Sequence, residues 1–317
     1  MNEFDFIAQY LKQQHHDADV VLGIGDDAAI VRPRMGFDWC VSSDMLLAGQ
    51  HFFADVDAAD LAYKALAVNL SDMAAMGAIP RWVLLSVALP SLQSEWLRAF
   101  CDTLFAVCAD YGLTLIGGDT TKGELAINVT IMGELPQGQA LRRDAAQVGD
   151  DVWVSGQLGL AAAALQHLQG KCVLPAHCFT VCEQALLRPT PRVALGQALL
   201  PFAHAAQDVS DGLAQDLGHI AQASAVGAVI EVDKLPTLPA LRACLPQWAE
   251  LALTGGDDYE LVFTAAPQQR ANIVAIGQKL NVPVQCVGSI TQQTGVRILD
   301  KQGLPLSLTQ LGFDHFG

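Results

Sequence analysis

The apolar positions in the first half of this chain change period repeatedly, which predicts alternating strands and helices. A period of two predicts a strand, and apolar residues three or four positions apart predict an amphipathic helix. The longest helical pattern begins behind Asp57 and Asp60, two candidate caps, and ends at Gly77 ahead of Pro80. The expected helices cover 3–14, 57–77 and 92–111, and the expected strands cover 17–33 (two strands around a Gly-Asp turn), 37–46, 81–90 and 113–135 (two strands around a Gly-Asp-Thr turn).

The second half shows the same mixture after a polar segment at residues 136–150. Strands are expected within 151–159, 227–235, 259–265 and 284–290, and helices over 159–169, 179–200 and a segment after Asp208 with Leu213, Leu217 and Ile220 on one stripe. Strands and helices in both halves predict the α/β (α+β) class, with two domains at residues 1–138 and 139–317. Gly-Gly-Asp occurs at 117–119 and 255–257, which is too short to establish a repeat.

The composition narrows the class of ligand. Hydrophobic residues make up 51% and charged residues 16% of 317, enough to bury a large core. The net charge of -15 argues against nucleic acid, whose phosphates need Lys and Arg, but metal ions can make an acidic site bind a small phosphorylated ligand. The amino terminus is acidic and amphipathic, and no apolar run reaches the ~20 residues of a membrane span. We therefore expect neither a membrane anchor nor a targeting segment.

The eight cysteines contain no C-x-x-C pair, and most lie in apolar runs. In a chain of this length they predict reduced core residues and a cytoplasmic protein. His177, Cys178 and Cys182 offer an alternative reading as a metal site, although no fourth ligand is near them in sequence.

Aspartates recur beside glycine or hydroxyl residues, between apolar strands or helices. Strand ends and glycine turns are places where the backbone can approach a ligand. One Asp-Gly is usually a turn former, but six such positions together favour a shared binding function. They are Asp26-Asp27, Asp44 at the expected end of its strand, Asp72, Asp119, Asp208 with Asp211, and Asp257-Asp258.

Asp72 is the sharpest case because its helical neighbours include Leu70, Met73 and Met76. An ionised carboxylate in such surroundings needs a cation or several hydrogen-bond donors. Hydroxyls adjacent to the aspartates complete an all-oxygen set, which suits Mg²⁺ rather than zinc. These hydroxyls belong to Ser42, Ser43, Thr120 and Ser210. Several Mg²⁺ ions in turn suit phosphoryl transfer, where positioning and charge neutralisation supply most of the catalysis.

Two common nucleotide-binding motifs do not explain the chain. No G-x-x-x-x-G-K-[ST] is present, so it is not a P-loop protein. The segment from Gly23 to Ala28 fits G-x-G-x-x-A, but two aspartates would face the pyrophosphate and a strand pattern follows where a helix is required. Metal held by carboxylates must then replace a phosphate-cradling loop.

A series of motifs is similar, in order, to those of the thiamine-monophosphate kinases, in the superfamily that includes aminoimidazole ribonucleotide synthetase. The motifs are GIGDDAA, VSSDMLLAGQHF, KALAVNLSDMAAMGAIP, GGDTT, RRDAAQVGD, LRPTPR, DVSDGL, GGDDYELVF and GFDHF. The resemblance covers essentially the whole chain. It implies a two-domain aminoimidazole ribonucleotide synthetase-like fold with mixed sheets flanked by helices. It also implies a homodimer paired through the N-terminal domains, which bind ATP and Mg²⁺ while the C-terminal domains complete the site.

The implied reaction is direct transfer from ATP to thiamine monophosphate, giving thiamine diphosphate and ADP as the last step of thiamine diphosphate biosynthesis. Carried over by motif, the implied metal ligands are Asp27, Ser42, Ser43, Asp44, Asp72, Asp119, Asp208 and Asp211. Asp44, Asp72, Asp119 and Asp208 are the implied catalytic residues, and Gly118, Asp119, Arg143 and Ser210 contact ATP. His51, Asp257 and Phe313 line the implied thiamine phosphate pocket, with ordinary packing as the alternative for His51 and Phe313.

Three positions depart from the family pattern. Asp257 stands where the family commonly has Glu, Ala145 where it has Gly, and Phe313 where it often has Trp or Tyr. The first and third touch the substrate pocket, so the metal side of the site is the better supported. Whether Lys64 and Lys122 reach phosphate is open.

Two other classes of function compete with the kinase. The first is another ATP-dependent synthetase of the superfamily. Selenophosphate synthetases carry a reactive Cys or selenocysteine near the amino terminus, whereas the first cysteine here is Cys40, inside an expected strand. The hydrogenase-maturation relatives end in a reactive cysteine, whereas this chain ends His315-Phe316-Gly317. The second is a nucleotide- or metal-binding regulator, which would bind ATP without consuming it and ignore thiamine monophosphate.

Overall fold

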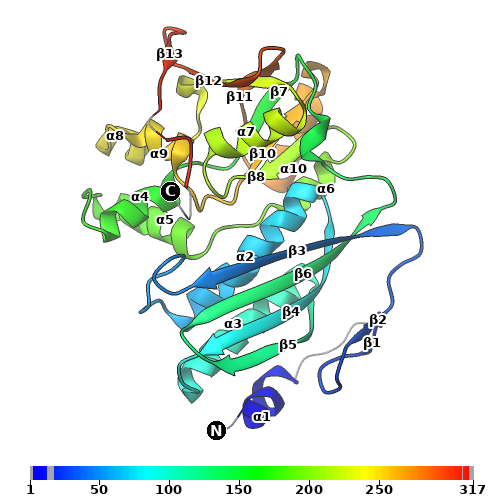
Figure 1. The fold of residues 1–317 in the computed structure, drawn as a ribbon. Coiled ribbons are helices and arrows are strands. Elements are labelled where there is room, and N and C mark those ends of the chain that lie inside the picture. Colours follow the sequence, from blue (N-terminus) through cyan, green and yellow to red (C-terminus); the bar gives the residue numbers. More distant parts are fainter. Residues whose placement is uncertain (1–2, 13–17, 309, 314–317) are drawn as a thin grey trace. The chain divides into compact units, whose positions relative to one another are not determined.

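The computed structural model describes residues 3–12, 18–308 and 310–313, so the terminal His315-Phe316-Gly317 lies outside the described residues. The chain divides into two compact units. The first comprises the chain up to Met73 together with Ala78–Gln139, and the second comprises Ala74–Gly77 and the chain from Ala140 onward. Sheets flanked by helices occur in both, as expected for the α/β (α+β) class (Figure 1).

The first unit is built on a four-stranded sheet in the order β3-β6-β4-β5. Its strands are β3 (Phe37–Leu47), β4 (Ile79–Leu89), β5 (Thr114–Lys122) and β6 (Ala126–Pro136). β4 and β5 are parallel, and β6 pairs antiparallel with both β3 and β4. A separate two-stranded hairpin joins β1 (Val20–Leu22) to β2 (Ile30–Val31), as the Gly-Asp turn between them predicted.

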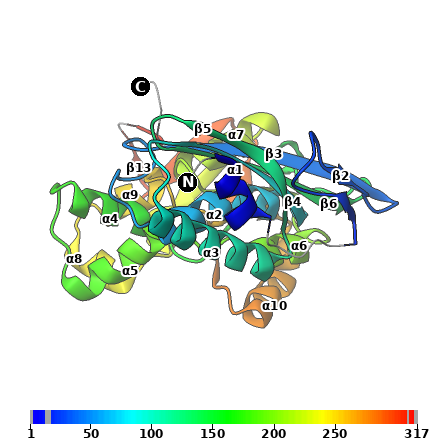
Figure 2. The same cartoon turned by 90° about the horizontal axis from the view of Figure 1, so that it is seen from below.

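Helices α2 (Ala58–Met76) and α3 (Ser94–Tyr111) lie against one face of this sheet (Figures 1 and 2). The side chain of Asp57 accepts the backbone N–H of Ala59, which confirms it as a cap, and Gly77 ends α2 with a φ of +74°. The expected helix over 3–14 is instead the short α1 (Glu3–Phe6) and a π-helical turn, η1 (Ile7–Leu11), and residues 13 and 14 lie outside the described part.

Two expectations for this unit were wrong in detail. The strand expected at 37–46 continues to Leu47, so Ser42, Ser43 and Asp44 lie within β3 rather than at its end. The Gly-Asp-Thr segment expected as a turn lies inside β5. Gly118 is nevertheless required there, since its φ is +149° and a Cβ would lie 1.8 Å from the carbonyl oxygen of Leu85.

The second unit contains a seven-stranded sheet in the order β13-β12-β9-β11-β7-β10-β8. The strands are β7 (Asp151–Ser155), β8 (Ala205–Asp208), β9 (Gly227–Glu231), β10 (Leu261–Ala265), β11 (Val284–Thr291), β12 (Gly295–Leu299) and β13 (Pro305–Leu306). β9 and β12 pair in parallel, and the other neighbours pair antiparallel. At the β8 edge, Asp208 faces Leu261, which places the following loop beside the start of β10.

The helices of this unit are α4 (Leu160–Leu168), α5 (Ala176–Leu187), α6 (Val193–Leu199), α7 (Leu213–Ala223), α8 (Pro239–Cys244), α9 (Trp248–Thr254) and α10 (Arg270–Leu280). The predicted apolar stripe of α7 is confirmed, because Leu213, Leu217 and Ile220 are fully buried in the core. The single helix expected over 179–200 is wrong. It is broken between α5 and α6 at Pro189 and Pro191, which restrict the backbone and lack N–H donors.

Short 3-10 turns complete the described elements: η2 (Arg143–Ala145), η3 (Val232–Lys234) and η4 (Pro267–Gln269). Among the described helices, none combines the length and the apolar composition that crossing a bilayer requires.

Candidate active site

The first unit brings Asp44 of β3 together with Asp72 of α2. Side chains alternate between the two faces of a strand, so Cys40, Ser42 and Asp44 share the face that α2 covers. The hydroxyl of Ser42 donates a 2.5 Å hydrogen bond to the Asp72 carboxylate. This strand and helix therefore place two carboxylates and a hydroxyl, all oxygen ligands, in one partly buried region.

The two carboxylates disfavour each other's charge. Burial, followed by the charge of Asp72, raises the pKa of Asp44 to about 7. The same two causes raise the pKa of the neighbouring Cys40 thiol to about 11. A divalent cation would relieve this repulsion, so the donor set and its electrostatics fit Mg²⁺.

Ser43 does not join this group through its side chain. It lies on the opposite face of β3, where its hydroxyl is 2.9 Å from the Thr130 hydroxyl and accepts a hydrogen bond from the Asn128 amide. Ser42 and Ser43 were expected together as ligands, but adjacent strand residues point to opposite faces. Their hydroxyls are separated for that reason.

Asp27 and Asp119, the other expected carboxylates of the first unit, are both exposed. Asp27 follows the hairpin turn and donates its backbone N–H to the Asp26 carboxylate. Asp119 lies in β5 opposite Ser86 of β4. Within the described residues, no three His, Cys, Asp or Glu side chains form a group that could hold a metal ion. The structure therefore brings Asp44 and Asp72 together without adding Asp27 or Asp119 to them.

His51 is held in the turn that follows β3. Its ring Nδ1 accepts the backbone N–H of Leu47 at 3.1 Å, and the backbone N–H of His51 donates to the Leu47 carbonyl at 3.0 Å. This arrangement assigns the ring proton to Nε2. Lys64 and Lys122 were the two lysines for which contact with phosphate was left open. Lys64 is buried in α2, whereas Lys122 is exposed at the end of β5.

In the second unit, the loop after β8 and the loop before β10 are bonded to each other. The carbonyls of Val209 and Ser210 accept the N–H groups of Tyr259 and Asp257, at 2.8 and 2.9 Å. Val209 in turn donates to the Glu260 carbonyl at 2.7 Å. The expected residues Asp208, Ser210 and Asp211 thus lie beside the expected substrate residue Asp257.

Asp257 sits in a strained segment of backbone. Its φ is +69° and that of Tyr259 is +49°, a region that costs a non-glycine residue about 1 to 3 kcal/mol. The Tyr259 hydroxyl donates to the Asp257 carboxylate at 3.1 Å. Between them, Asp258 accepts the N–H of Gly159, at the start of α4, at 2.8 and 3.0 Å. Burial raises the pKa of Asp258 well above its usual range.

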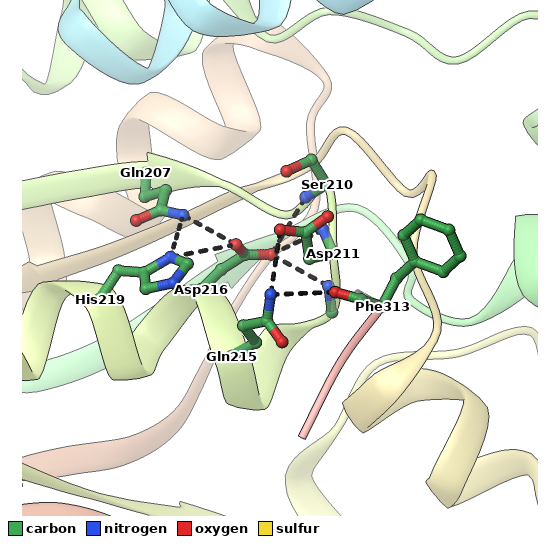
Figure 3. A network of polar contacts seen from close by, with 8 residues as sticks. Gln207, Ser210, Asp211, Gln215, Asp216, His219 and Phe313 are labelled. Atoms are coloured by element: carbon green, nitrogen blue, oxygen red, sulfur yellow. Dashed lines mark hydrogen bonds and ion pairs between the residues drawn. The ribbon is translucent and has the colours of Figure 1, made fainter. Parts of the chain in front are cut away.

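A buried carboxylate, Asp216 of α7, organises the loop after β8 (Figure 3). One of its oxygens accepts the consecutive N–H groups of Ser210, Asp211 and Gly212 at 3.0 to 3.1 Å. The other accepts the side-chain amide of Gln207 at 2.7 Å. Burial raises the pKa of Asp216 to about 7 against the opposing effect of these backbone donors.

Phe313 is tied to the same loop through its backbone. Its N–H donates to the Asp211 carbonyl at 3.0 Å, and its carbonyl accepts the Gln215 amide, which also donates to the Asp211 carboxylate (Figure 3). The Phe313 ring is half exposed. Arg143 is also exposed, and its carbonyl accepts the Ser224 hydroxyl just beyond α7. Hydrogen bonds at the start of α7 thus join the metal-side candidate Asp211 to the substrate-side candidate Phe313.

The cysteine segment does not form a metal site. Cys178 and Cys182 of α5 are fully buried, and Cys172 and Cys244 pack against the same cluster. Burial raises the pKa of Cys182 to about 12, which disfavours the thiolate that a metal requires. All eight cysteines lie in the described residues, and none of them forms a disulfide.

Asp216, Gln215 and Tyr259 were not among the candidates from the sequence, whereas Asp258 was one of the expected aspartates. Asp216 carries the same signal as Asp72, a carboxylate on the apolar stripe of a helix, here between Leu213 and Leu217. The positive φ of Tyr259 has no comparable signal in the sequence, because Gly, Asn and Asp are the residues that usually mark this backbone region and Tyr does not.

Comparisons with known proteins identify the class of protein to which this chain belongs. Residues 25–135 match the N-terminal domain of AIR synthase related proteins, and residues 147–301 match their C-terminal domain. The thiamine-monophosphate kinase of Salmonella typhimurium is 45% identical over 322 residues, covering 99% of this chain and 98% of that protein.

Solved structures agree with the sequence comparison. The crystal structure of thiamine-monophosphate kinase from Stenotrophomonas maltophilia has a TM-score of 0.84 at 46% identity, covering 93% of this chain and 94% of that one. AaThiL complexed with AMPPCP and TMP has a TM-score of 0.79 at 30% identity, covering 99% and 96%. The chain belongs to the thiamine-monophosphate kinase family, within the AIR synthase related proteins.

Proposed function

We propose that this chain phosphorylates thiamine monophosphate with ATP, giving thiamine diphosphate and ADP by direct transfer. The observation that carries the proposal is its full-length similarity to enzymes of that name. AaThiL, a structural relative with the same fold over nearly the whole chain, is complexed with AMPPCP and TMP, one ligand for each side of such a reaction.

We propose that Asp44 and Asp72 hold Mg²⁺ in the first unit, where Asp27, Asp119 and the Ser42–Ser43 segment are further ligands, and that Asp208 and Asp211 are the Mg²⁺ ligands of the second unit. The raised pKa of Asp44 beside Asp72 supports this role, because such a pair is stabilised by a cation. Bound Mg²⁺ would neutralise the charge of the phosphates. Arg143 is exposed and can place its guanidinium on phosphate oxygens, and the Gly118 backbone permits close approach of the nucleotide.

No strong general base is required, because the acceptor phosphate is largely ionised near neutral pH, with a second pKa of about 6. On the acceptor side, we propose His51, Asp257 and Phe313 as the pocket. The half-exposed ring of Phe313 and the Asp257 carboxylate suit a flat cation such as the thiazolium ring. Tyr259 holds the Asp257 carboxylate in place.

We propose that the N-terminal domain, residues 1–138, pairs two copies of the chain, while residues 139–317 complete the ATP and substrate site. An apolar row on β3, Trp39, Val41, Met45 and Leu47, supports this, since it lies on the face opposite α2 with 38 to 58% of each side chain exposed. A Val41→Glu variant should shift the chain to a monomer in light-scattering measurements. Cysteines without disulfides and the acidic charge support a cytoplasmic enzyme without nucleic acid or membrane partners.

The decisive experiment measures thiamine diphosphate formation from ATP and thiamine monophosphate, with Mg²⁺ and with excess chelator. We expect product only with Mg²⁺. If the protein binds ATP and leaves thiamine monophosphate unconsumed, the kinase assignment fails. Consumption of ATP without that product would favour another synthetase, and binding without consumption would favour a regulator.

A further inference from the structure

The strongest unassigned feature is the set of hydrogen bonds that converge on Asp216. The side chain is 1% exposed and lies one turn into α7. Its Oδ2 accepts three consecutive backbone N–H groups, from Ser210 (3.1 Å), Asp211 (3.1 Å) and Gly212 (3.0 Å). Figure 3 shows these bonds meeting at one oxygen, with Gln207 and His219 at the other.

Consecutive N–H groups that point to one place form a concave anion-binding nest. In many proteins the occupant is a phosphate from a ligand. Here the occupant is the chain's own Asp216 carboxylate, so the nest shapes the loop instead of binding nucleotide. With the N–H groups turned inward, the carbonyls of Val209 and Ser210 face the neighbouring loop and accept Tyr259 and Asp257.

The same loop carries the expected metal ligands at its two ends. Asp208 ends β8 and is 5% exposed, whereas Asp211 stands between two residues whose N–H groups Asp216 holds. Gly212 completes the turn with a φ of +133°, where a Cβ would lie 2.8 Å from the Thr254 carbonyl carbon. The direction of the Asp211 side chain therefore depends on the backbone that Asp216 fixes.

We propose that Asp216 is a positioning residue that folds the 208–212 loop into the conformation that presents Asp208 and Asp211 to divalent metal. The inference rests on the proposed function for the metal role of those two aspartates. The backbone carbonyl of Asp211 accepts the Phe313 N–H, and the Asp211 carboxylate accepts the Gln215 amide. The conformation of the loop therefore also influences the position of Phe313.

Two variants separate the acceptor from the shape of the side chain. Asp216→Leu keeps the approximate size in an apolar core but leaves three N–H groups without their acceptor. Asp216→Asn keeps an acceptor oxygen, although a neutral one. Its amide nitrogen can donate to Gln207 if that side chain turns over, because the buried Gln207 Oε1 has no hydrogen-bond partner in the described structure.

Asp150 offers a matched control. It is a buried carboxylate of the same unit that accepts the Gln147 N–H at 2.9 Å and contacts His204 Nδ1 at 2.9 and 3.0 Å. It precedes β7 and bonds to no residue of the 208–212 loop among the described contacts. Asp150→Leu and Asp150→Asn therefore remove a similar buried charge without touching the nest.

The experiment measures amide hydrogen exchange at residues 210–212 and the affinity for Mn²⁺ alone, without substrates. Asp216→Leu should speed exchange at these amides by about tenfold or more and weaken Mn²⁺ binding by a similar factor. Asp216→Asn should speed the same amides by about threefold, since hydrogen bonds to a charged acceptor are roughly twice as strong. The Asp150 variants should leave both quantities within about twofold of wild type.

Unchanged exchange at 210–212 in Asp216→Leu would overturn the proposal, as would an equal loss of Mn²⁺ affinity in the Asp150 variants. If Asp216→Leu does not fold, Asp216→Asn decides, and normal exchange there also overturns it. If the wild type does not bind Mn²⁺, the proposal also fails, because it requires Asp208 and Asp211 to bind divalent metal. If these results are as expected and no thiamine diphosphate forms, the proposed reaction fails while the role of Asp216 stands.

Discussion

The pair Asp44–Asp72 in the first unit and Asp216 in the second use the same residue type in opposite ways. Asp72 and Asp216 both lie on helices among apolar neighbours, and burial raises the pKa of Asp44 and of Asp216 to about 7. Asp44 faces another carboxylate and has the Ser42–Asp72 contact beside it, whereas Asp216 faces three N–H groups and an amide.

The difference lies in what compensates the desolvation of the carboxylate. Backbone donors satisfy Asp216 within the fold, so it can act as internal structure. The charge of Asp72 raises the pKa of Asp44, and a bound cation would relieve this repulsion between the two carboxylates. A buried aspartate therefore indicates ligand binding only after its donors are known.

The largest effect is expected from the pair itself. Asp44→Asn or Asp72→Asn should lower kcat by about a thousandfold or more, because charge neutralisation supplies most of the catalysis in phosphoryl transfer. The measurement is steady-state formation of thiamine diphosphate, with circular dichroism to verify folding. Asp38→Asn, an exposed residue of the same strand, is the control and should keep wild-type turnover. Wild-type turnover in either test variant would remove that aspartate from the site.

A third carboxylate tests compensation by a buried guanidinium. Arg192 donates to both oxygens of Glu260, at 2.5 and 2.7 Å, and both side chains are mostly buried. Arg192→Met should lower the free energy of unfolding by about 3 kcal/mol, because it leaves a buried charge without this partner. Urea denaturation measures the change. Lys234→Met removes the half-exposed Lys234–Glu231 pair and should change stability by no more than about 0.5 kcal/mol. Equal losses would contradict the argument.

The pH dependence of stability tests the compensation at Asp258. Its folded pKa lies well above the unfolded value of about 4, so the folded protein retains a proton that the unfolded chain loses. This contribution to stability is complete below about pH 4 and is lost as the pH rises toward the folded pKa. Asp258→Asn should flatten that decline.

Urea denaturation of the metal-free protein at a series of pH values above 4 measures the effect. The wild type and the variant share the contributions of Asp44 and Asp216, so the difference between their curves isolates Asp258. Parallel curves would show that Asp258 is not desolvated in the folded protein.

The smallest effect is expected on the acceptor side. Phe313→Leu removes an aromatic face from a half-exposed position and should raise the KM for thiamine monophosphate by about threefold, with little change in kcat or in the KM for ATP. Phe179→Leu, remote in sequence and packed against His167, provides a control aromatic. An unchanged KM would assign Phe313 to packing.

Local patterns predicted much of the fold. The apolar stripe of α7, the Asp57 cap and the Gly77 end of α2 depend on neighbours within one turn, so the sequence carries them directly. The break between α5 and α6 was missed although Pro189 and Pro191 signal it, because the apolar period on both sides is continuous. The strand position of Gly118-Asp119 was also missed, since Gly-Gly-Asp is usually a turn signal.

The sequence by itself determined that carboxylates occur where apolar strands and helices meet, because periodicity and composition are properties of the chain. Only the tertiary structure decided what each carboxylate faces. The alternation of β3 separates the hydroxyls of Ser42 and Ser43, and α2 sets Asp72 near Asp44. The fold of the loop after β8 turns three N–H groups onto Asp216. Donors from distant segments set the electrostatics of a buried charge, and sequence proximity does not reveal them.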